Sequence, residues 1–179
     1  MNHDHFMMQE EPDFQFCPVC GGRLETSRLK ENEPERLVCS DCQFIFYLDP
    51  KLVASSVVEL DGGIVLLRRG IEPQKGKWVV PGGYVDRGEA VEAAALRETE
   101  EECGIRTRIK KLLGVYSYPG RAVAVAVYVT EYLTGDLRAG EEALEVRQFR
   151  LEEIPWDDLA FPSTADALKD YCHLRDVSS

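Results

Sequence analysis

The sequence predicts an α+β fold, in which a mixed β-sheet and two main helices form one domain behind a small N-terminal module. Three observations lead to this prediction. After residue 50, strand-like runs rich in β-branched residues alternate with Gly-containing turns, a helical pattern covers 89–103, and before residue 50 four cysteines occur in two close pairs. With 179 residues the chain is longer than one small domain, and we expect one domain with an appendage.

The predicted elements follow one another in a regular order. A Gly-containing turn at 61–63 joins two β-branched runs, which indicates a hairpin, and Gly104 is expected to end the first helix. We expect a second helix from about Ser163 to Arg175, with Ser163 as its N-cap. The expected strands lie at 44–48, 53–60, 64–69, 112–118, 121–133 and 144–149, with a loop at 71–83.

Composition and charge exclude several classes of protein. Hydrophobic residues make up 44% and charged residues 30%, which is typical of a globular chain. The net charge is −11, and residues 1–50 hold 4 basic and 10 acidic side chains, so we expect no nucleic-acid partner. No apolar run reaches membrane-spanning length, and the first residues lack the pattern of a secretory signal. We therefore expect a cytoplasmic protein with no membrane partner.

Four of the six cysteines form two Cys-x-x-Cys pairs, separated by eighteen residues. This spacing is typical of a zinc site, because two tight knuckles can place four thiolates tetrahedrally around one Zn²⁺. Two disulfides in a secreted domain, or a redox pair, are the alternatives. We expect a mobile acidic tail at 1–16, a metal-binding module at 17–50 and a second domain at 51–179. The expected zinc ligands are Cys17, Cys20, Cys39 and Cys42, whereas Cys103 and Cys172 are expected to pack in the interior.

The helical segment 89–103 carries glutamates on its apolar side. At 100° per residue, Glu98 and Glu102 fall within about 20° of the centre of the apolar stripe, and Glu101 lies beside them. Unpaired carboxylates held there would repel one another and resist desolvation, so a cation must sit among them. A hard divalent ion such as Mg²⁺ is the simplest candidate. The alternative is a solvated acidic face in which Arg97 pairs locally.

These residues resemble the signature of a known family. The run Gly83-x5-Glu89-x7-Arg97-Glu98-Thr99-x-Glu101-Glu102-x-Gly104-Ile105 is similar to the Nudix box, with Thr99 where a bulky aliphatic residue is usual. The four-cysteine module in front of it resembles the zinc ribbon of a Nudix subgroup that acts on ADP-ribose, FAD or NADH. The resemblance implies a Nudix-type α/β/α sandwich with a mixed sheet, preceded by a zinc ribbon, and it favours a homodimer.

The resemblance also implies an activity and the residues that perform it. A Nudix hydrolase uses Mg²⁺ or Mn²⁺ to cleave the diphosphate linkage of a nucleoside diphosphate derivative, and it releases a nucleoside monophosphate. By carry-over, Glu101 and Glu102 are metal ligands, and Glu98 is a ligand or the base that orients water. The carbonyl of Gly82 is a further ligand, and Arg97 forms an internal pair with Glu89.

Substrate choice is less strongly indicated. ADP-ribose and FAD are the preferred candidates, and NADH is the alternative, because the Pro- and Trp-rich array of NADH pyrophosphatases is absent where this chain has SYPGRAVAVAVY. Two alternatives come from other classes, a nucleotide-sensing regulator without activity and a zinc-ribbon nucleic-acid binder. The retained glutamates disfavour the first, and the acidic N-terminal region disfavours the second.

Several residues outside the box are candidates for the site. Residues 51–88 are net positive, which suits a phosphate entrance, and from them we select Arg69 and Lys77 as substrate contacts. Tyr118 is expected to line a nucleotide pocket. Glu145 is expected to reach the metals, because alternation places it on one face with an inward Phe149. The loop glutamates at 141 and 142 are the alternatives.

Overall fold

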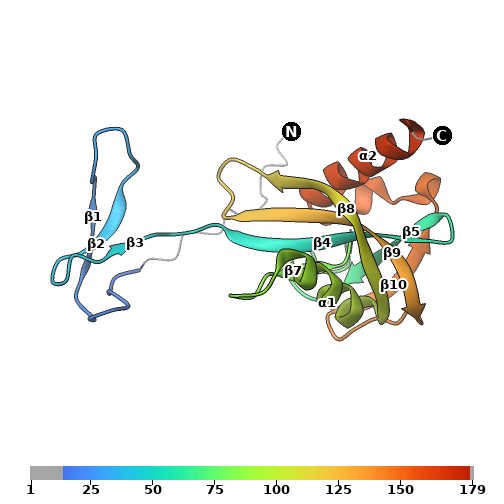
Figure 1. Cartoon of the computed structure of the whole chain (residues 1–179), viewed down its shortest axis with the longest axis horizontal. Helices are drawn as coiled ribbons and strands as arrows, with labels where there is room; N and C mark the ends of the chain where they lie inside the picture. Colours follow the sequence, from blue (N-terminus) through green and yellow to red (C-terminus); the bar gives the residue numbers. More distant parts are fainter. Residues whose placement is uncertain (1–13, 178–179) are drawn as a thin grey trace. The chain divides into compact units, whose positions relative to one another are not determined.

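The computed structural model describes residues 14–177, so most of the predicted tail at 1–16 lies outside the described residues. The chain divides into two compact units, Met1–Pro50 and Lys51–Ser179 (Figure 1), and each is described by itself. Among the described residues, no helix is both long enough and apolar enough to cross a membrane.

The N-terminal unit is a small antiparallel sheet with a minimal core. Its strands are β1 (Leu24–Ser27), β2 (Arg36–Cys39) and β3 (Ile45–Phe46), in the order β1-β2-β3. The buried residues are two cysteines and one leucine, against which two partly buried side chains pack. So little apolar surface supplies little folding free energy, as expected for a module that depends on metal binding. The core consists of Cys17, Leu24 and Cys39, with Leu37 and Phe46 beside it.

The second unit is built on one mixed sheet, as predicted. Its main strands run in the order β10-β5-β4-β9-β8, and the short strands β6 and β7 pair with β5 and β4. Strands β4 and β9 pair in parallel, whereas the other pairs are antiparallel. The strands are β4 (Lys51–Leu60), β5 (Gly63–Arg69), β6 (Trp78–Val79), β7 (Gly82–Tyr84), β8 (Ile105–Ser117), β9 (Val123–Gly135) and β10 (Ala143–Phe149).

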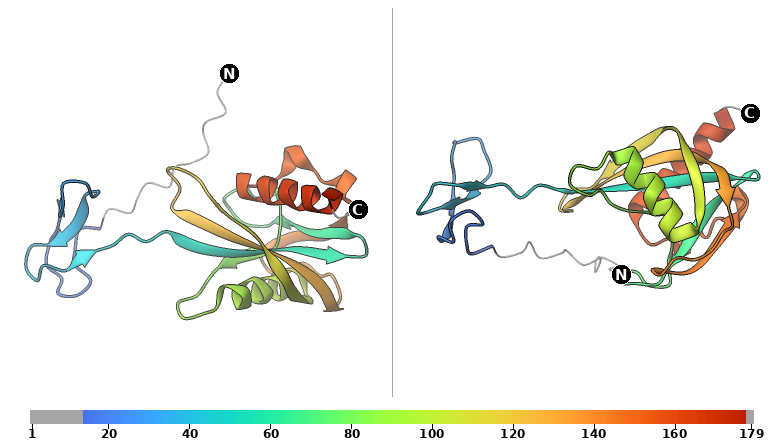
Figure 2. Two further views of the ribbon diagram at one scale, coloured as in Figure 1. Left: turned by 45° about the horizontal axis from the view of Figure 1, so that its top comes forward. Right: turned by 60° about the horizontal axis from the view of Figure 1, so that its bottom comes forward.

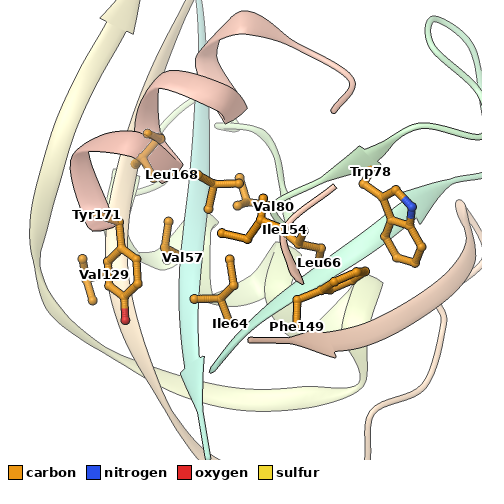
Figure 3. Packing of buried hydrophobic residues seen from close by; sticks show 12 residues of the cluster. Val57, Ile64, Leu66, Trp78, Val80, Val129, Phe149, Ile154, Leu168 and Tyr171 are labelled. Atoms are coloured by element: carbon orange, nitrogen blue, oxygen red, sulfur yellow. The ribbon is translucent and has the colours of Figure 1, made fainter. Parts of the chain in front are cut away.

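Two helices cover the two faces of this sheet (Figure 2). Helix α1 (Val91–Cys103) packs on one face, and α2 (Pro162–Val177) packs on the other, preceded by the short helices η1 (Leu151–Glu153) and η2 (Trp156–Asp158). The predicted α/β/α sandwich is therefore confirmed. The core on the α2 side is the larger, and Trp78 packs edge-on against Phe149 within it, with ring centroids 4.8 Å apart (Figure 3).

Local sequence accounts for the turns and helix ends. Asp61 and Gly62 both have positive φ, 46° and 81°, which suits the tight hairpin between β4 and β5. Gly104 ends α1 in the left-handed conformation, and its N–H donates to the carbonyl of Glu100. The expected N-cap at Ser163 is wrong, because α2 begins one residue earlier at Pro162, a residue well suited to the first helical position.

Candidate active site

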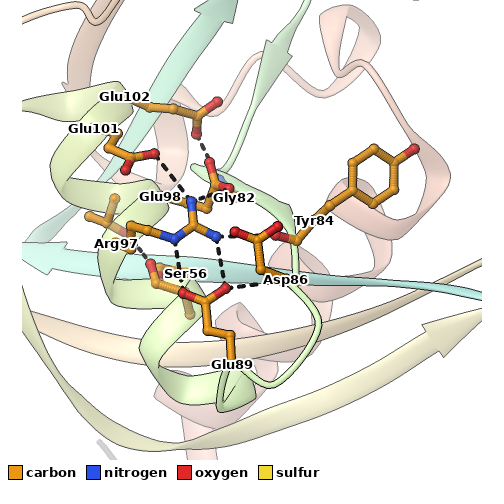
Figure 4. A network of polar contacts seen from close by, with 11 residues as sticks. Ser56, Gly82, Tyr84, Asp86, Glu89, Arg97, Glu98, Glu101 and Glu102 are labelled. Carbon is orange, nitrogen blue, oxygen red and sulfur yellow. Dashed lines mark hydrogen bonds and ion pairs between the residues drawn. The ribbon is translucent and has the colours of Figure 1, made fainter.

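The glycine turn of β7 lies directly against the glutamates of α1. The N–H of Gly82 donates to Oε2 of Glu102 over 2.8 Å. A Cβ at Gly83 would overlap the carboxylate of Glu98, so glycine lets the two elements approach without displacing that side chain. The structure thus brings the predicted residues Gly82, Glu98 and Glu102 together, and Figure 4 shows the carboxylates of Glu98 and Glu102 turned toward this loop.

Arg97 connects the glutamates to the loop. Its Nε and NH2 each donate to one oxygen of Glu89 over 2.9 Å, and its NH1 contacts Glu98 at 2.7 Å and Glu101 at 3.2 Å. NH2 also donates to the carbonyl of Tyr84. The hydrogen bonds from Arg97 lower the pKa of Glu89 to about 2. The Arg97 guanidinium thus places a positive charge between Glu98 and Glu101, and the divalent ion expected at these glutamates stays a prediction.

Glu102 has a perturbed acidity. Burial raises its pKa to about 7, and the negative charges of Glu98 and Glu142 act in the same direction. The hydrogen bond from Gly82 and the charge of Arg69 oppose this shift. Carboxyl groups whose pKa is strongly raised by burial occur preferentially at functional sites, which makes Glu102 a candidate functional residue.

These oxygens suit a hard divalent cation, which takes carboxylate and carbonyl ligands. The carboxylates are not yet arranged as a ligand set, since among residues 14–177 the cysteines alone bring three or more ligand atoms within 4.8 Å of one another. NH1 of Arg97 would have to release Glu98 and Glu101. Nε and NH2 could keep their pair with Glu89 while this happens, so the loop would stay attached to the helix.

The N-terminal unit holds a second cluster, made of four thiols. Their sulfur atoms all lie within 4.8 Å of one another, and they form no disulfide. Within the cluster the N–H of Cys42 lowers the pKa of Cys39 to about 7, whereas the neighbouring thiols raise the pKa values of Cys20 and Cys42, so one thiol of the set carries the thiolate first. The set fits a closed tetrahedral Zn²⁺ site. Backbone N–H groups of the knuckles donate to three sulfurs, from Val19 to Cys17, from Gly22 to Cys20 and from Cys42 to Cys39.

Comparison with known families decides the identity of the fold. The family model of the NUDIX domain matches residues 50–171, which is more than half of the chain. The chain belongs to the Nudix hydrolase family. A second model, described as Nudix N-terminal, matches residues 15–48, where the cysteine cluster lies.

Relatives and solved structures agree with this assignment. The chain is 38% identical over 133 residues to an ADP-ribose pyrophosphatase of Methanocaldococcus jannaschii, a match that covers 72% of this chain and 77% of the relative. It is 26% identical to the NAD-capped RNA hydrolase NudC of Salmonella heidelberg over 79% of this chain, but the match spans only 53% of that relative. A NUDIX hydrolase from Nitrosomonas europaea has the same fold, with a TM-score of 0.84 and 36% identity, over 91% of this chain and 93% of the other.

Thr99, the departure from the Nudix box, lies in the core. It is fully buried on the sheet side of α1, together with Ala95 and Cys103. Its hydroxyl donates to the carbonyl of Ala95 over 2.7 Å, so the buried polar group is satisfied. The substitution therefore concerns packing and leaves the carboxylates where the box places them.

Glu145, which was expected to reach the metals, lies on β10. Alternation along β10 does put it on one face with Phe149, and Phe149 is buried. That face is the α2 side of the sheet, whereas Val146 packs on the α1 side with Cys103. Glu145 itself is exposed. This placement does not favour a contact between Glu145 and the metals, and the assignment stays a prediction.

Glu142, in the turn before β10, is an acidic residue outside α1 that acts on the cluster. Its charge raises the pKa of Glu102 and acts on Arg69, and its carbonyl accepts the N–H of Gly70 over 2.7 Å. The signal in the sequence was the acidic turn GEEAL, but strand alternation favoured Glu145 over the glutamates of that turn.

Arg69 lies at the edge of the same region. Its guanidinium is 5.0 Å from the ring centroid of Phe161, and its Nε donates to the carbonyl of Pro73 over 2.8 Å. Burial lowers its pKa, and the negative charge of Glu102 opposes the shift. Arg69 is thus a cation held near the carboxylates, as a phosphate contact requires.

The two other expected substrate contacts already have partners. Lys77 pairs with Asp158 across 2.8 Å. The hydroxyl of Tyr118 donates to Asp166 of α2 over 2.8 Å, and burial raises the pKa of Tyr118. Neither residue is placed against the glutamates by these contacts.

Proposed function

We propose that this Nudix hydrolase cleaves the diphosphate linkage of ADP-ribose or FAD and releases a nucleoside monophosphate. The observation that carries the proposal is the group of glutamates on α1, set against the glycine turn of β7. The 38% identity to a protein named ADP-ribose pyrophosphatase supports this substrate class. The loops that surround a diphosphate set the choice among such compounds.

The proposed metal site consists of Glu98, Glu101 and Glu102, with the carbonyl of Gly82 as a further ligand. Mg²⁺ or Mn²⁺ held there would neutralise the diphosphate and position water for attack on phosphorus. Glu102 would hold the cation as a carboxylate, and because burial raises its pKa to about 7, binding would displace a proton from it. Arg97 holds α1 to the loop through Glu89.

A base from outside α1 is part of the proposal. Glu142 and Glu145 are its candidates, and the electrostatic proximity of Glu142 to Glu102 supports Glu142. The paired variants Glu142→Gln and Glu145→Gln separate them, because the residue that activates water should lower kcat while the other leaves it nearly unchanged. A loss of turnover in Glu145→Gln alone would return the assignment to Glu145.

Arg69 and Lys77 are proposed to contact the phosphates. The position of Arg69 near Glu102 supports it more directly than Lys77, which is also half-buried and whose ammonium must first leave Asp158. Arg69→Gln should therefore raise KM more than Lys77→Gln does. An equal increase in KM for the two variants would show that Asp158 does not compete with the substrate for Lys77.

NADH is the alternative substrate, and the similarity to proteins named NudC is the observation that favours it. The test is one panel of ADP-ribose, FAD, NADH, nucleotide sugars and diadenosine polyphosphates with Mg²⁺ or Mn²⁺, scored by the nucleoside monophosphate released. Turnover of ADP-ribose or FAD with the higher kcat/KM supports the proposal. A clear preference for NADH selects the alternative, and no turnover at all refutes hydrolysis of this class.

We also propose that the four cysteines bind one structural Zn²⁺. The proposed boundaries are a ribbon at 17–50 and a hydrolase domain at 51–179, supported by the division of the chain at Pro50. A homodimer in the cytoplasm completes the proposal, and sedimentation of the purified protein tests the oligomeric state.

A further inference from the structure

A hollow of about 380 Å³ opens on the hydrolase sheet, and its side chains come from β4, β8, β9 and α2. It lies on the face opposite α1, because Val129 and Tyr171, which line it, belong to the core beneath α2 (Figure 3). Along β4 it is centred on Glu59, roughly 13 Å beyond the Ser55 that pairs with Gly82. The hollow is therefore separate from the candidate active site.

A β-bulge in β8 turns two consecutive lysines toward this hollow. Between the pairs that Ile109 and Lys111 form with β9, that strand advances by one residue and β8 by two. In a regular strand Lys110 and Lys111 would point to opposite faces, but here both line the hollow. Bulges re-aim side chains in this way, and they are over-represented next to functional sites. The fold thus concentrates positive charge at one place on the sheet.

A network around Glu59 uses part of this charge. Among the described side chains that line the hollow, three are cations and one, Glu59, is a carboxylate. Nζ of Lys110 donates to Glu59 over 2.6 Å, the hydroxyl of Tyr171 donates to it over 2.8 Å, and NH1 of Arg175 lies 3.7 Å away. Burial opposes the ionisation of Glu59, but the hydrogen bonds from Lys110 and Tyr171 outweigh it and lower its pKa. Glu59 is thus held as a carboxylate.

Lys111 is the cation that this network leaves over. Within residues 14–177 its side chain takes part in no ion pair and no hydrogen bond, although it lines the same hollow as Lys110. The lining is net positive in a chain whose net charge is −11, so the hollow differs in sign from the average surface. Leu174 adds an exposed apolar side chain next to the cations. An anion in the hollow can bind Lys111 directly and share Lys110 with Glu59.

We propose that this hollow is a second ligand site, which binds a phosphomonoester apart from the glutamates of α1. The phosphate group lies at Lys110 and Lys111, and the organic part lies against Leu174. A phosphomonoester carries a charge of about −1.5 to −2 at neutral pH and offers three acceptor oxygens, so one group can bridge two neighbouring ammonium groups. The assignment does not depend on the hydrolase reaction.

The test is an NMR titration of the zinc-loaded full chain with phenyl phosphate and with inorganic phosphate, at constant ionic strength. The buffer contains no Mg²⁺ or Mn²⁺, so the acidic cluster on α1 repels both probes. The variants are Lys111→Ala, Glu59→Gln and the control Lys169→Ala, an exposed lysine of α2 that pairs with Asp166.

In the wild type we expect the amide signals of Lys111 and Leu174 to shift, and phenyl phosphate to bind more tightly than inorganic phosphate. Lys111→Ala should weaken the binding of phenyl phosphate about fivefold, and Lys169→Ala should leave it within about twofold of the wild type. Glu59→Gln should strengthen it by about threefold, because Lys110 is released while the amide oxygen still accepts the hydrogen bond from Tyr171.

Three results would overturn the inference, with thermal unfolding showing that each variant is folded. One is the absence of these amide shifts up to roughly 20 mM phenyl phosphate, which would exclude a site of millimolar affinity. Another is unchanged binding in Lys111→Ala. The third is equal affinity for the two probes, which would remove the organic part from the proposed ligand. Weaker binding in Glu59→Gln would refute the competition between Glu59 and the anion for Lys110.

Discussion

The variant Gly83→Ala is expected to lower turnover strongly while leaving the stability of the fold almost unchanged. The added Cβ would overlap the end of the Glu98 side chain, and an ordinary contact of at least 3.4 Å requires the carboxylate to move by about 1 Å. That carboxylate is the flexible end of a side chain, so the displacement should cost under about 1 kcal/mol of stability. A metal ligand or base misplaced by about 1 Å should lose roughly 10²-fold in turnover.

The assay compares kcat and the thermal unfolding midpoint of three proteins. Gly82→Ala is the contrast, because its Cβ would meet the carbonyl of Ala54 and the Cα of Ser55, backbone atoms that cannot move aside. We expect Gly82→Ala to unfold at a clearly lower temperature, and Gly83→Ala to unfold near the wild-type midpoint with strongly reduced kcat. Normal turnover in a normally folded Gly83→Ala would refute the role given to Glu98.

Three further predictions follow from the sites. Elemental analysis should find about one zinc per chain, and Cys39→Ser should destabilise the N-terminal unit before it affects chemistry; zinc-free protein with paired disulfides would contradict this. In buffer without Mg²⁺ or Mn²⁺, the free energy of unfolding should fall as the pH rises from 4.5 to 7. The reason is that the raised pKa of Glu102 favours the folded state only while the carboxyl is protonated. This fall should be smaller in Glu102→Gln. Under one metal condition ADP-ribose or FAD should be cleaved with higher kcat/KM than NADH, and the reverse order would show that the missing Pro- and Trp-rich array is a poor guide.

Fixed spacing explains why part of the site could be predicted from sequence. The helical period placed Glu98 and Glu102 on the buried side of α1, and the structure has Ala94, Ala95 and Thr99 on that same side. The hairpin of β4 and β5 could be predicted from sequence in the same way, because its turn needs residues that adopt positive φ. These features depend on local geometry alone.

Other features depend on contacts that local patterns do not encode. Strands β6 and β7 lie in a segment rich in Gly and Pro, and they form because β5 and β4 offer them edges to pair with. Alternation grouped Glu145 with Phe149 correctly, but it could not say which of the two faces they occupy, since helices bury both faces of this sheet. The contact of Arg97 with the carbonyl of Tyr84 likewise arises only when the loop folds against α1, so the sequence pattern does not encode it.

The most direct test of the divalent-metal site is the kcat of Glu102→Gln for ADP-ribose at saturating Mg²⁺. Its control is Glu100→Gln, the same substitution on the same helix at an exposed glutamate that pairs with Arg106. The site predicts that Glu102→Gln lowers kcat by about 10²-fold or more, because several kcal/mol of charge stabilisation are lost, while Glu100→Gln stays within about twofold of the wild type. Equal turnover of the two folded variants would contradict the assignment of the glutamates to a catalytic metal.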